Sequence, residues 1–569
     1  MAATTERLAG ASKQSMSRAL HACVVVVVVA ATGCGTGSVP QPPTGSDPPP
    51  ASSSNPNCNA QSLDPANWPS DELASFAVSP YEQLTSDPVV DQSAKGMIVG
   101  TSGPLAIRAG RKALENCGSA MDAVVATAMT QIALAAGQWV SYAGHAEMLY
   151  YDASTHTITA LNGGWNALLQ EDSPGTIPPE GEVPTGRSVL AHGFMDAMGV
   201  GHERWGRLPW ASLLAPSIWV AEHGLVVDSG MFNVMAIRAP YIYRTPEGRE
   251  IFLKPDGTPY LEGDVFKQPL LAKTLHGLAE HGRRYLYEGP WADKWVELVQ
   301  REGGKATLDD LTQYHALFQE PVSGEVAGYT LYGPASSVPY FYKTLNALTT
   351  IHDADLKSMG TPYESAQALF TELQAWDNAS MEAPAQKGMH SDGVVAVDAN
   401  GNVAALLHSI NAVSWGSTGI FVDGVSISDA ASINQDRAAA AGPGGRMETE
   451  VVPTIVANSE GVPVLATSTI GTGLLEINFN RLVDFIEYGE HFADAVYNPS
   501  FHYVDTVAIG DYPAPVIAGV FAMGGHVVPL PDQALETRGY IVGAEIDPVT
   551  GTISGGFGGD DNGKAEGVK

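Results

Sequence analysis

Two apolar runs joined by a tight turn constrain the fold of this 569-residue chain more than any other feature. Val394–Val397 and Val403–Leu407 are apolar at every position, and the Asn400-Gly401 pair between them is typical of a hairpin turn, which needs positive φ angles. A strand that is apolar on both faces has to be covered on both faces. The hairpin therefore predicts a sheet buried between two other layers.

Polar residues gather at the open end of this hairpin. If residues 399–401 form the loop, Ser391 faces Ser409, and a β-bulge would shift this register by one residue. Ser409 and Asn411 share a face because side chains alternate along a strand. We therefore expect Ser391, Ser409 and Asn411 to be neighbours. Such groups either bond nearby backbone or form a functional site.

Helical and strand patterns alternate along the rest of the chain and predict one large α/β (α+β) domain that begins near Asn67. Helices are expected at 105–116, 120–136, 189–204, 210–223, within 265–302 and at 475–487. Strands are expected at 147–152, 158–161, 393–397, 403–410, 454–457 and 464–467. Ser119 and Asp122 form an approximate capping box at the start of the second helix.

The charge balance excludes some classes of partner. Asp and Glu number 62 against 30 Lys and Arg, which gives a formal net charge of −32. Such a chain repels the phosphates of nucleic acids and of anionic lipid surfaces, so neither is expected as a partner. The chain has no CxxC or HExxH motif and no carboxylate cluster with ligand spacing. We therefore expect neither a metal site nor a cofactor.

The N-terminal residues 1–33 are typical of an export signal. Basic residues precede the apolar run 22–31, which is too short to span a bilayer. Thr32-Gly33-Cys34 resembles a bacterial lipobox and predicts a lipid on Cys34, with an ordinary signal peptide as the alternative. The Pro-, Ser- and Gly-rich residues 34–66 then form a tether. We expect an exported protein of the bacterial cell envelope whose only membrane attachment is this lipid.

Cys58 and Cys117 are the cysteines outside the signal and the lipobox. An oxidising compartment permits a disulfide between them, but two cysteines without a spacing pattern favour a small, packed and unpaired Cys117. The Gly-rich run at 555–563 is expected to be a loose C-terminal tail rather than a calcium-binding turn, because it occurs only once.

Residues 391–402 resemble the nucleophile motif of the gamma-glutamyltransferase family, whose members are N-terminal nucleophile hydrolases. Ser391-Asp-Gly-Val-Val-Ala-Val-Asp-Ala-Asn-Gly-Asn402 lies over that motif without a gap. Ser409 and Asn411 stand where the family has a second hydroxyl residue and an amide. Similar segments follow the family order from about residue 93 to 555, among them 96–99, 114–123, 206–218, 289–304, 453–456 and 495–502.

This resemblance implies a four-layer αββα sandwich and self-cleavage between His390 and Ser391. Residues 67–390 then correspond to the family's large subunit and residues 391–569 to its small subunit, and the two fragments stay associated. Cleavage converts an amide nitrogen, which cannot accept a proton, into an α-amine with a pKa of about 7.7–8. A serine hydroxyl is a weak nucleophile without an adjacent base, so the freed amine lets Ser391 carry its own base.

The resemblance also assigns roles around the nucleophile. Ser391 is the nucleophile, Ser409 hydrogen-bonds it, and Asn411 contacts the substrate. Gly471 and Thr472 match the family's paired glycines, whose backbone N–H groups stabilise the oxyanion. The alternative for this pair is an ordinary strand-to-helix turn.

The residues that bind a γ-glutamyl group in the family are replaced. Gly164 stands where an Arg holds the glutamyl α-carboxylate, and Thr449 and Glu450 stand where two serines hold it. We expect Glu450 to repel a carboxylate. Glu147 and Trp165 either shape a pocket for a neutral or amine-bearing substrate or are structural. Ser432 and Ile433 replace the acidic pair that receives the glutamyl α-amine.

These observations predict a gamma-glutamyltransferase-like proenzyme that hydrolyses or transfers an amide-linked acyl group of a small molecule or peptide. Its specificity is expected to be altered away from glutamyl groups, and a cephalosporin-acylase-like specificity is one variant. The alternative is a non-catalytic relative that serves as a binding protein on the cell surface. The loss of the glutamyl pocket favours this alternative, and the presence of Ser391, Ser409 and Asn411 opposes it.

Overall fold

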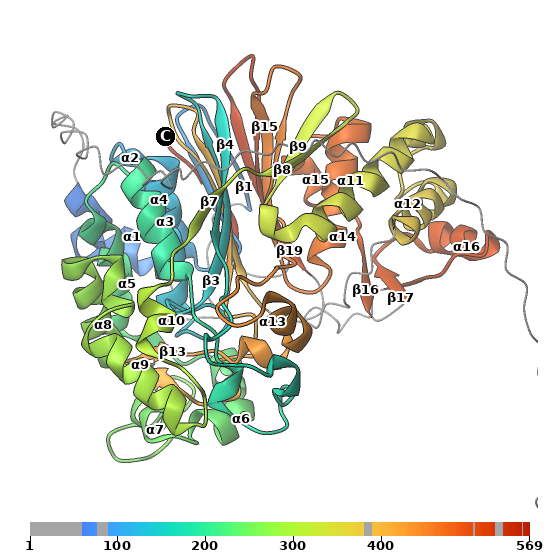
Figure 1. The fold of residues 1–569 in the computed structure, drawn as a ribbon. Coiled ribbons are helices and arrows are strands. Elements are labelled where there is room, and N and C mark those ends of the chain that lie inside the picture. Colours follow the sequence, from blue (N-terminus) through green and yellow to red (C-terminus); the bar gives the residue numbers. More distant parts are fainter. Residues whose placement is uncertain (1–59, 77–88, 380–389, 505–506, 530–538, 560–561) are drawn as a thin grey trace, which may run out of the picture. The chain divides into compact units, whose positions relative to one another are not determined.

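Two seven-stranded sheets stack face to face at the centre of the protein, and helices cover their outer faces (Figure 1). The structure is a computed structural model that describes residues 60–76, 89–379, 390–504, 507–529, 539–559 and 562–569. The predicted signal at 1–33, the lipidation residue Cys34 and most of the predicted tether lie outside these ranges.

One sheet contains the predicted hairpin and is called the hairpin sheet. Its strands are antiparallel and follow the order β21 (Lys564–Gly567), β2 (Met97–Gly100), β10 (Asp392–Val397), β11 (Val403–Ser409), β3 (His145–Asp152), β4 (Thr157–Gly163) and β7 (Leu317–Gln319). The other, called the facing sheet, follows the order β1 (Val90–Ser93), β20 (Ile553–Gly558), β19 (Tyr540–Ile546), β15 (Pro463–Ile470), β14 (Thr454–Ala457), β9 (Tyr329–Gly333) and β8 (Val322–Val326).

The hairpin β10–β11 has the predicted register, with Asp392 opposite His408 and Val397 opposite Val403. Its loop of three residues differs slightly from the expected turn. Gly401 has a φ of 83°, whereas Asn400 is not among the residues with positive φ. A turn followed by one left-handed residue is a common way to close a three-residue hairpin loop, and glycine adopts that conformation without steric cost.

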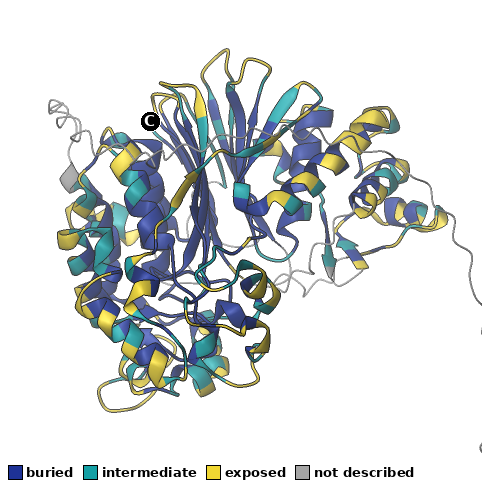
Figure 2. Ribbon diagram, in the orientation of Figure 1, coloured by how far each residue is buried: buried dark blue, intermediate teal, exposed yellow. Residues whose placement is uncertain are grey.

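The two faces of the hairpin are buried against different layers. Val395 and Leu407 pack between the sheets together with Ile455 of β14, Ala466 of β15 and Val542 of β19. Alternate residues of the same strands, among them Val394, Ala396, Ala404 and Leu406, pack against helices. Figure 2 shows the resulting buried centre. Each large aliphatic side chain removed from water stabilises the fold by roughly 1.5–3 kcal/mol.

Helices complete four layers, so the predicted αββα sandwich is confirmed. The outer face of the hairpin sheet is covered by α2 (Pro104–Glu115), α3 (Ala120–Leu134), α4 (Phe194–Trp205) and α5 (Trp210–His223) (Figure 1). The facing sheet is covered by α11 (Val338–Asp353), α12 (Ala366–Asn378) and α14 (Leu474–Val483). Every residue of α3 is buried, and its predicted capping box between Ser119 and Asp122 is present.

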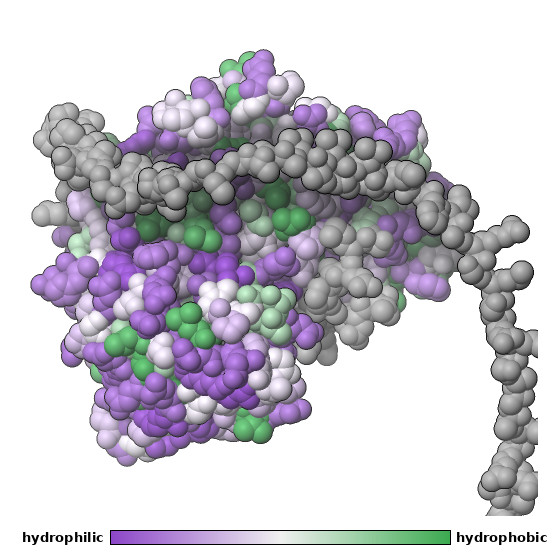
Figure 3. All heavy atoms as spheres, in the orientation of Figure 1, coloured by the Kyte–Doolittle hydropathy of each residue, from purple (hydrophilic) through white to green (hydrophobic). Residues whose placement is uncertain are grey.

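Nine further α-helices and seven further strands are found in the described residues. The helices are α1 (Ser70–Ala74), α6 (Ser229–Ile242), α7 (Pro246–Phe252), α8 (Pro269–His281), α9 (Pro290–Arg301), α10 (Leu308–Thr312), α13 (Gln435–Ala441), α15 (Phe492–Ala495) and α16 (Ala514–Ala522). The remaining strands are β5 (Leu225–Val226), β6 (Val265–Phe266), β12 (Phe421–Val422), β13 (Val425–Ser426), β16 (Phe501–Val504), β17 (Val507–Gly510) and β18 (Val527–Pro529). Hydrophilic residues cover much of the face in Figure 3, in keeping with the charge of −32.

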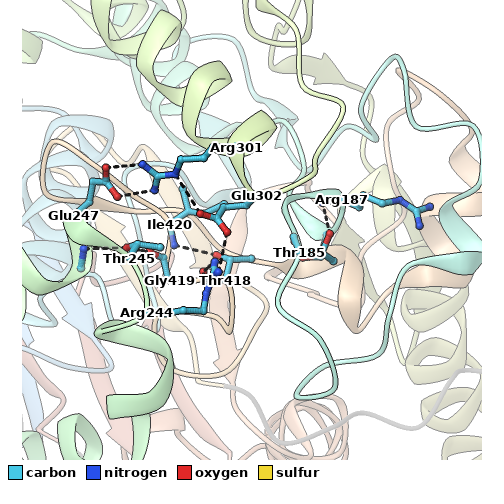
Figure 4. A network of polar contacts seen from close by, with 12 residues as sticks. Thr185, Arg187, Arg244, Thr245, Glu247, Arg301, Glu302, Thr418, Gly419 and Ile420 are labelled. Carbon is cyan, nitrogen blue, oxygen red and sulfur yellow. Dashed lines mark hydrogen bonds and ion pairs between the residues drawn. The ribbon is translucent and has the colours of Figure 1, made fainter.

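A polar network fixes the chain that follows β11 (Figure 4). Arg244 donates a hydrogen bond from Nε to the Thr418 carbonyl oxygen at 2.9 Å and from Nη1 to Glu302 at 2.8 Å. The Thr245 hydroxyl donates to the Gly419 carbonyl oxygen at 2.6 Å. The segment after the hairpin is therefore held by residues of the α6–α7 turn and the end of α9.

Three predictions, about the start of the domain, the state of Cys117 and the Gly-rich run near the C-terminus, differ from the structure. A 3₁₀ helix already spans Ala60–Leu63, before the expected start at Asn67, because Leu63 is buried against the helical layer. Cys117, expected to be unpaired, is disulfide-bonded, and its partner lies outside the described residues. Part of the expected Gly-rich tail is strand β20, where glycine is required because a Cβ at Gly555 would lie 2.7 Å from the Met97 sulfur.

Candidate active site

Ser391 lies immediately before β10 and directly opposite Ser409, the last residue of β11. The Ser391 hydroxyl donates a hydrogen bond to the Ser409 Oγ at 3.0 Å, and both residues are buried. The predicted neighbourhood is therefore a direct contact, and no bulge shifts the register. These two hydroxyl groups lie at the end of the seam between the two sheets, because the residues that follow them on the same face pack between the sheets.

The Ser409 hydroxyl connects three groups. It accepts hydrogen bonds from the Ser391 hydroxyl and from the Asn411 N–H, the latter at 2.9 Å. It donates to the carbonyl oxygen of His390 at 3.2 Å. This carbonyl belongs to the peptide bond between His390 and Ser391. A hydroxyl that donates to a carbonyl oxygen polarises it, so the Ser391 hydroxyl lies beside a polarised peptide bond.

Asn411 adopts a left-handed backbone conformation with a φ of 49°. Asparagine tolerates this region better than most residues, so its identity suits the turn. The turn brings its N–H onto the Ser409 hydroxyl. Its side-chain amide makes no hydrogen bond to any residue that the structure describes, and is free to contact another molecule.

A buried carboxylate, Asp392, anchors the start of β10. One carboxylate oxygen accepts hydrogen bonds from the hydroxyls of Thr101 at 3.0 Å and Ser102 at 2.5 Å, and the other accepts from the Trp139 indole N–H at 3.0 Å. The Gly393 N–H donates to the Thr101 hydroxyl at 2.9 Å. Charge-assisted bonds of this kind fix the residue that follows Ser391 in one orientation.

The facing sheet approaches this strand closely at Gly393. A Cβ at Gly393 would lie 2.9 Å from the Ser468 Oγ of β15, and the Ser468 hydroxyl donates to the Leu406 carbonyl oxygen at 2.8 Å. Gly471 and Thr472 follow β15 and precede α14. Within the part of the chain that the structure describes, the N–H groups of Gly471 and Thr472 donate no hydrogen bond. These donors are therefore available to another acceptor.

The row that begins with Ser391 and Ser409 continues across β3. His145 pairs directly with Ser409, so its side chain lies on the same face. Burial lowers the pKa of His145 to about 3, and the nearby Arg437 guanidinium adds to this shift. The imidazole ring lies 5.7 Å from the Trp165 indole, measured between ring centroids. Trp165 is thereby connected to Ser409 through one intervening side chain, His145.

Glu147 lies two residues further along β3 on the same face and is fully buried. Burial raises the pKa of Glu147 to about 8, while the nearby Ser336 hydroxyl and Arg446 guanidinium oppose the shift. The Ser336 hydroxyl lies near this carboxyl group, but neither carboxyl oxygen makes a hydrogen bond of good geometry to a described residue. At neutral pH this carboxyl group is therefore mostly protonated.

Gly164 is close to Glu147 and to a cation from a distant part of the sequence. A Cβ at Gly164 would lie 3.2 Å from a Glu147 carboxyl oxygen and 3.3 Å from the Cδ of Arg446. The Arg446 guanidinium donates to the Asn162 carbonyl oxygen at 2.9 Å and to the His315 carbonyl oxygen at 2.8 Å. A positive charge is thus present beside Gly164, although it comes from another segment.

Thr449 and Glu450 belong to the segment that carries Arg446. The Thr449 N–H donates to the Ser336 carbonyl oxygen at 3.1 Å. Glu450 is buried and forms an ion pair with Arg437. Its charge is compensated within the protein, and this partner of Glu450 was missed by the sequence reasoning.

Ser432 and Ile433 lie in and just after a 3₁₀ turn that spans Ala430–Ser432. The Ser432 hydroxyl donates a hydrogen bond to the Asp429 carbonyl oxygen at 2.7 Å, so its hydrogen is used within this turn. Asp429 is buried, and its carboxylate accepts a hydrogen bond from the Ser417 N–H at 3.1 Å. Within the residues described, no group of His, Cys, Asp and Glu side chains is arranged to hold a metal ion.

A comparison with protein families identifies this architecture. The family model described as gamma-glutamyltranspeptidase matches residues 106–383. The chain belongs to the gamma-glutamyltranspeptidase family. The glutathione hydrolase proenzyme of Escherichia coli is 22% identical over 521 residues, which cover 79% of this chain and 89% of that protein. The glutathione hydrolase proenzyme of Bacillus subtilis is 30% identical over 251 residues and is matched over only 42% of its length.

A solved structure shares the fold of this gamma-glutamyltranspeptidase relative. The cephalosporin acylase from Bacillus halodurans superposes with a TM-score of 0.71 at 20% sequence identity, covering 86% of this chain and 98% of that chain. In the described residues, no helix is both long and apolar enough to cross a membrane.

In this member of the gamma-glutamyltranspeptidase family, the predicted site residues fall into two neighbouring groups. Ser391, Ser409 and Asn411 are in contact, and Gly164, Trp165, Thr449 and Glu450 lie around His145 and Ser336. Sequence reasoning missed Asp392, His145, Ser336, Arg437 and Arg446. Asp392 could have been found in the sequence as a carboxylate at the start of an otherwise apolar strand. Arg437 and Arg446 have no comparable feature in the sequence.

Proposed function

We propose that this protein is an N-terminal nucleophile amide hydrolase or acyltransferase in which Ser391 is the nucleophile. The observation that carries the proposal is the chain of hydrogen bonds from the Ser391 hydroxyl through the Ser409 hydroxyl to the His390 carbonyl oxygen. Membership of the gamma-glutamyltranspeptidase family supports it. The curated relatives carry the name glutathione hydrolase proenzyme, and a proenzyme is the form that precedes cleavage.

Maturation follows from the position of Ser391. Its oxygen attacks the carbonyl carbon of His390, the hydroxyl proton passes to the Ser391 nitrogen, and the C–N bond breaks. The product is an ester between His390 and the Ser391 oxygen, with a free α-amine at Ser391. Water then attacks the ester, which releases a His390 carboxylate and restores the Ser391 hydroxyl. The Ser409 hydroxyl stabilises the first step because it donates to the carbonyl oxygen that becomes negative.

Turnover uses the new terminus as nucleophile and base. The Ser391 oxygen attacks the carbonyl carbon of the substrate amide while the α-amine accepts the hydroxyl proton and passes it to the leaving amine. The N–H groups of Gly471 and Thr472 stabilise the oxyanion. The acyl group remains as an ester on Ser391 until water, or a second amine in a transfer reaction, attacks it and regenerates the hydroxyl.

The two fragments stay associated after cleavage because β10, the strand that follows the new terminus, is a central strand of the hairpin sheet and not an edge strand. β10 is hydrogen-bonded to β2 on one side and to β11 on the other, and both of its faces are buried. The α-amine is thereby fixed at the end of a covered strand.

The acyl group is proposed to differ from a glutamyl group. Gly164 leaves no side chain where the family has Arg, and Arg446, the cation that lies nearby, is already hydrogen-bonded to carbonyl and amide oxygens. Trp165, Thr449 and Glu450 line the same region, and Asn411 is proposed to contact the substrate. We further propose export to the cell envelope with a lipid on Cys34, and no cofactor.

A denaturing gel of the purified full chain tests this function. We expect two fragments, and N-terminal sequencing of the smaller one is expected to begin at Ser391. Ser391→Ala should give one intact chain. A wild-type chain that never cleaves and hydrolyses no amide would overturn the enzyme and favour the non-catalytic binding relative.

A further inference from the structure

Four buried side chains near Ser391 and Ser409 have polar atoms without a hydrogen-bond partner among the described residues. These atoms are both ring nitrogens of His145, both carboxyl oxygens of Glu147, the indole N–H of Trp165 and the hydroxyl of Ser336. Glu147 is 0% exposed, and the most exposed of the four, Ser336, is only 8% exposed. Buried polar groups in native proteins are nearly always hydrogen-bonded, so such a concentration needs an explanation.

The four side chains form one cluster that reaches the nucleophile. His145 pairs with Ser409 across β3 and β11, and its ring contacts Trp165. Glu147 lies on the same face of β3, close to Gly164 and to the Ser336 hydroxyl. The cluster therefore begins beside Ser409 and extends away from Ser391 along the seam between the sheets. We take an acyl group attached to Ser391 to extend in this direction.

The charged groups around the cluster are already engaged. The Arg446 guanidinium donates to Asn162, Asn166 and the His315 carbonyl oxygen. The Arg437 guanidinium is paired with Glu450 and also donates to the Tyr340 hydroxyl at 2.8 Å. Glu450 balances the charge of Arg437, whereas Arg446 has no carboxylate partner among the described residues but already donates its N–H groups to neutral oxygens.

The unpartnered groups themselves are neutral near pH 7. Burial holds the pKa of His145 at about 3 and raises that of Glu147 to about 8, so the first is a neutral imidazole and the second a carboxylic acid. Together with an indole N–H and a hydroxyl, they offer several hydrogen-bond donors and acceptors.

We infer that His145, Glu147, Trp165 and Ser336 bind the far end of an uncharged polar acyl group, such as a primary carboxamide. This inference rests on the proposed function, because it takes the acyl group to be attached to Ser391. A carboxamide supplies two N–H donors and a carbonyl acceptor, which match the free acceptors and donors of the cluster. A carboxylate would have to displace the neutral oxygens that already accept from Arg446. An ammonium group would enter a buried site in which Glu147 is protonated and Glu450 is paired with Arg437, at a large desolvation cost. A purely alkyl end would leave the buried polar atoms unpaired.

Five p-nitroanilides with matched five-carbon acyl groups test this inference on the matured enzyme. The acyl groups are glutaramoyl (carboxamide end), glutaryl (carboxylate end), 5-aminopentanoyl (ammonium end), γ-glutamyl (both charges) and pentanoyl (alkyl end). We expect the kcat/KM of the glutaramoyl anilide to exceed each of the others by about tenfold or more. A higher kcat/KM for glutaryl or γ-glutamyl would overturn the inference in favour of a carboxylate site, and one for 5-aminopentanoyl in favour of a cation site.

Two variants identify the residues responsible. Glu147→Leu should lower the ratio of glutaramoyl to pentanoyl turnover by about tenfold, whereas Glu147→Gln, which keeps a neutral donor and acceptor, should preserve it. Glu372→Leu is the matched control, because Glu372 is also buried with unpartnered carboxyl oxygens but packs in the helical layer over the facing sheet. An equal loss in the control would overturn the assignment.

The outcomes also separate this inference from the proposed function. A chain that cleaves at Ser391 but turns over none of the five anilides, or all five alike, refutes the carboxamide site and leaves the nucleophile assignment standing. A chain that does not cleave refutes the proposed function itself.

Discussion

The hydroxyl oxygens of Ser391 and Ser409 lie 3.0 Å apart at the open end of the β10–β11 hairpin. The contact joins two residues that are eighteen positions apart in sequence, and it depends on the register of one hairpin. Because Ser409 also donates to the His390 carbonyl oxygen, one hydroxyl contacts both the Ser391 hydroxyl and the peptide bond between His390 and Ser391.

Removing the Ser409 hydroxyl should therefore slow maturation. Ser409→Ala deletes the donor to the His390 carbonyl oxygen, and we expect cleavage to slow by roughly tenfold to several hundredfold, as for a lost oxyanion donor. A time course on denaturing gels measures the rate. Ser409→Thr keeps the hydroxyl and should cleave at a rate much closer to the wild type. Equal rates for the Ala variant and the wild type would show that this hydrogen bond does not assist the reaction.

Asp392 should matter for stability as well as for cleavage. Asp392→Asn replaces a carboxylate oxygen by an amide nitrogen, so at least one of the donors from Thr101, Ser102 and Trp139 loses its acceptor. Hydrogen bonds to a charged group contribute about 1.5–3 kcal/mol each, and we expect a loss of this size in the free energy of unfolding. Urea unfolding monitored by tryptophan fluorescence measures it.

The control for Asp392 is an exposed carboxylate. Asp256→Asn alters a surface turn in which Asp256 accepts from Thr258, and it should change the free energy of unfolding by less than about 0.5 kcal/mol. Comparable losses for Asp392→Asn and Asp256→Asn would contradict the anchoring role of Asp392.

Gly393 should resist substitution because the sheets approach closely there. A Cβ at this position would lie 2.9 Å from the Ser468 Oγ, and overpacking of a buried site costs roughly 1–3 kcal/mol. Gly393→Ala should lower the unfolding midpoint accordingly, and adding Ser468→Ala should recover part of the loss. Gly175→Ala is the control, since nothing lies within 4 Å of a Cβ there. A Gly393→Ala variant as stable as the control would disprove the steric argument.

The hairpin could be predicted from sequence because its information is local. Two continuous apolar runs, a glycine turn and a fixed register determine which residue faces Ser391, and a helix such as α3 is marked by its capping box and apolar composition. The surroundings of the acyl group could not be predicted in this way. Arg446 and Glu147 are about 300 residues apart in sequence and are brought together only by the stacking of sheets. The C-terminal strand β20 was missed because its glycines, which fit a close sheet contact, resemble a loose tail in sequence.

Glu147 makes stability depend on pH. Its folded-state pKa of about 8 lies above its ordinary value of 4.5, so the folded protein holds this proton more tightly than the unfolded chain does. The stabilising contribution is complete below about pH 4.5, falls as pH rises and is lost above about pH 8. The groups near Glu147 include His145 on its own strand, Ser336 before α11, Tyr314 and Arg446. The pKa of His145 is lowered to about 3 by burial, so this imidazole stays neutral between pH 5 and pH 8 and does not titrate against Glu147.

Comparing Glu147→Gln with the wild type isolates this titration. The amide cannot ionise, so the difference in the free energy of unfolding between the two proteins should change with pH in favour of the variant, by on the order of 1–4 kcal/mol between pH 5 and pH 8. Urea unfolding at each pH measures the difference. The background titration of all other groups cancels because both proteins share them. A difference that stays constant over this range would mean that Glu147 is ionised in the folded protein, and that its carboxyl group is paired or hydrated rather than buried as a neutral acid.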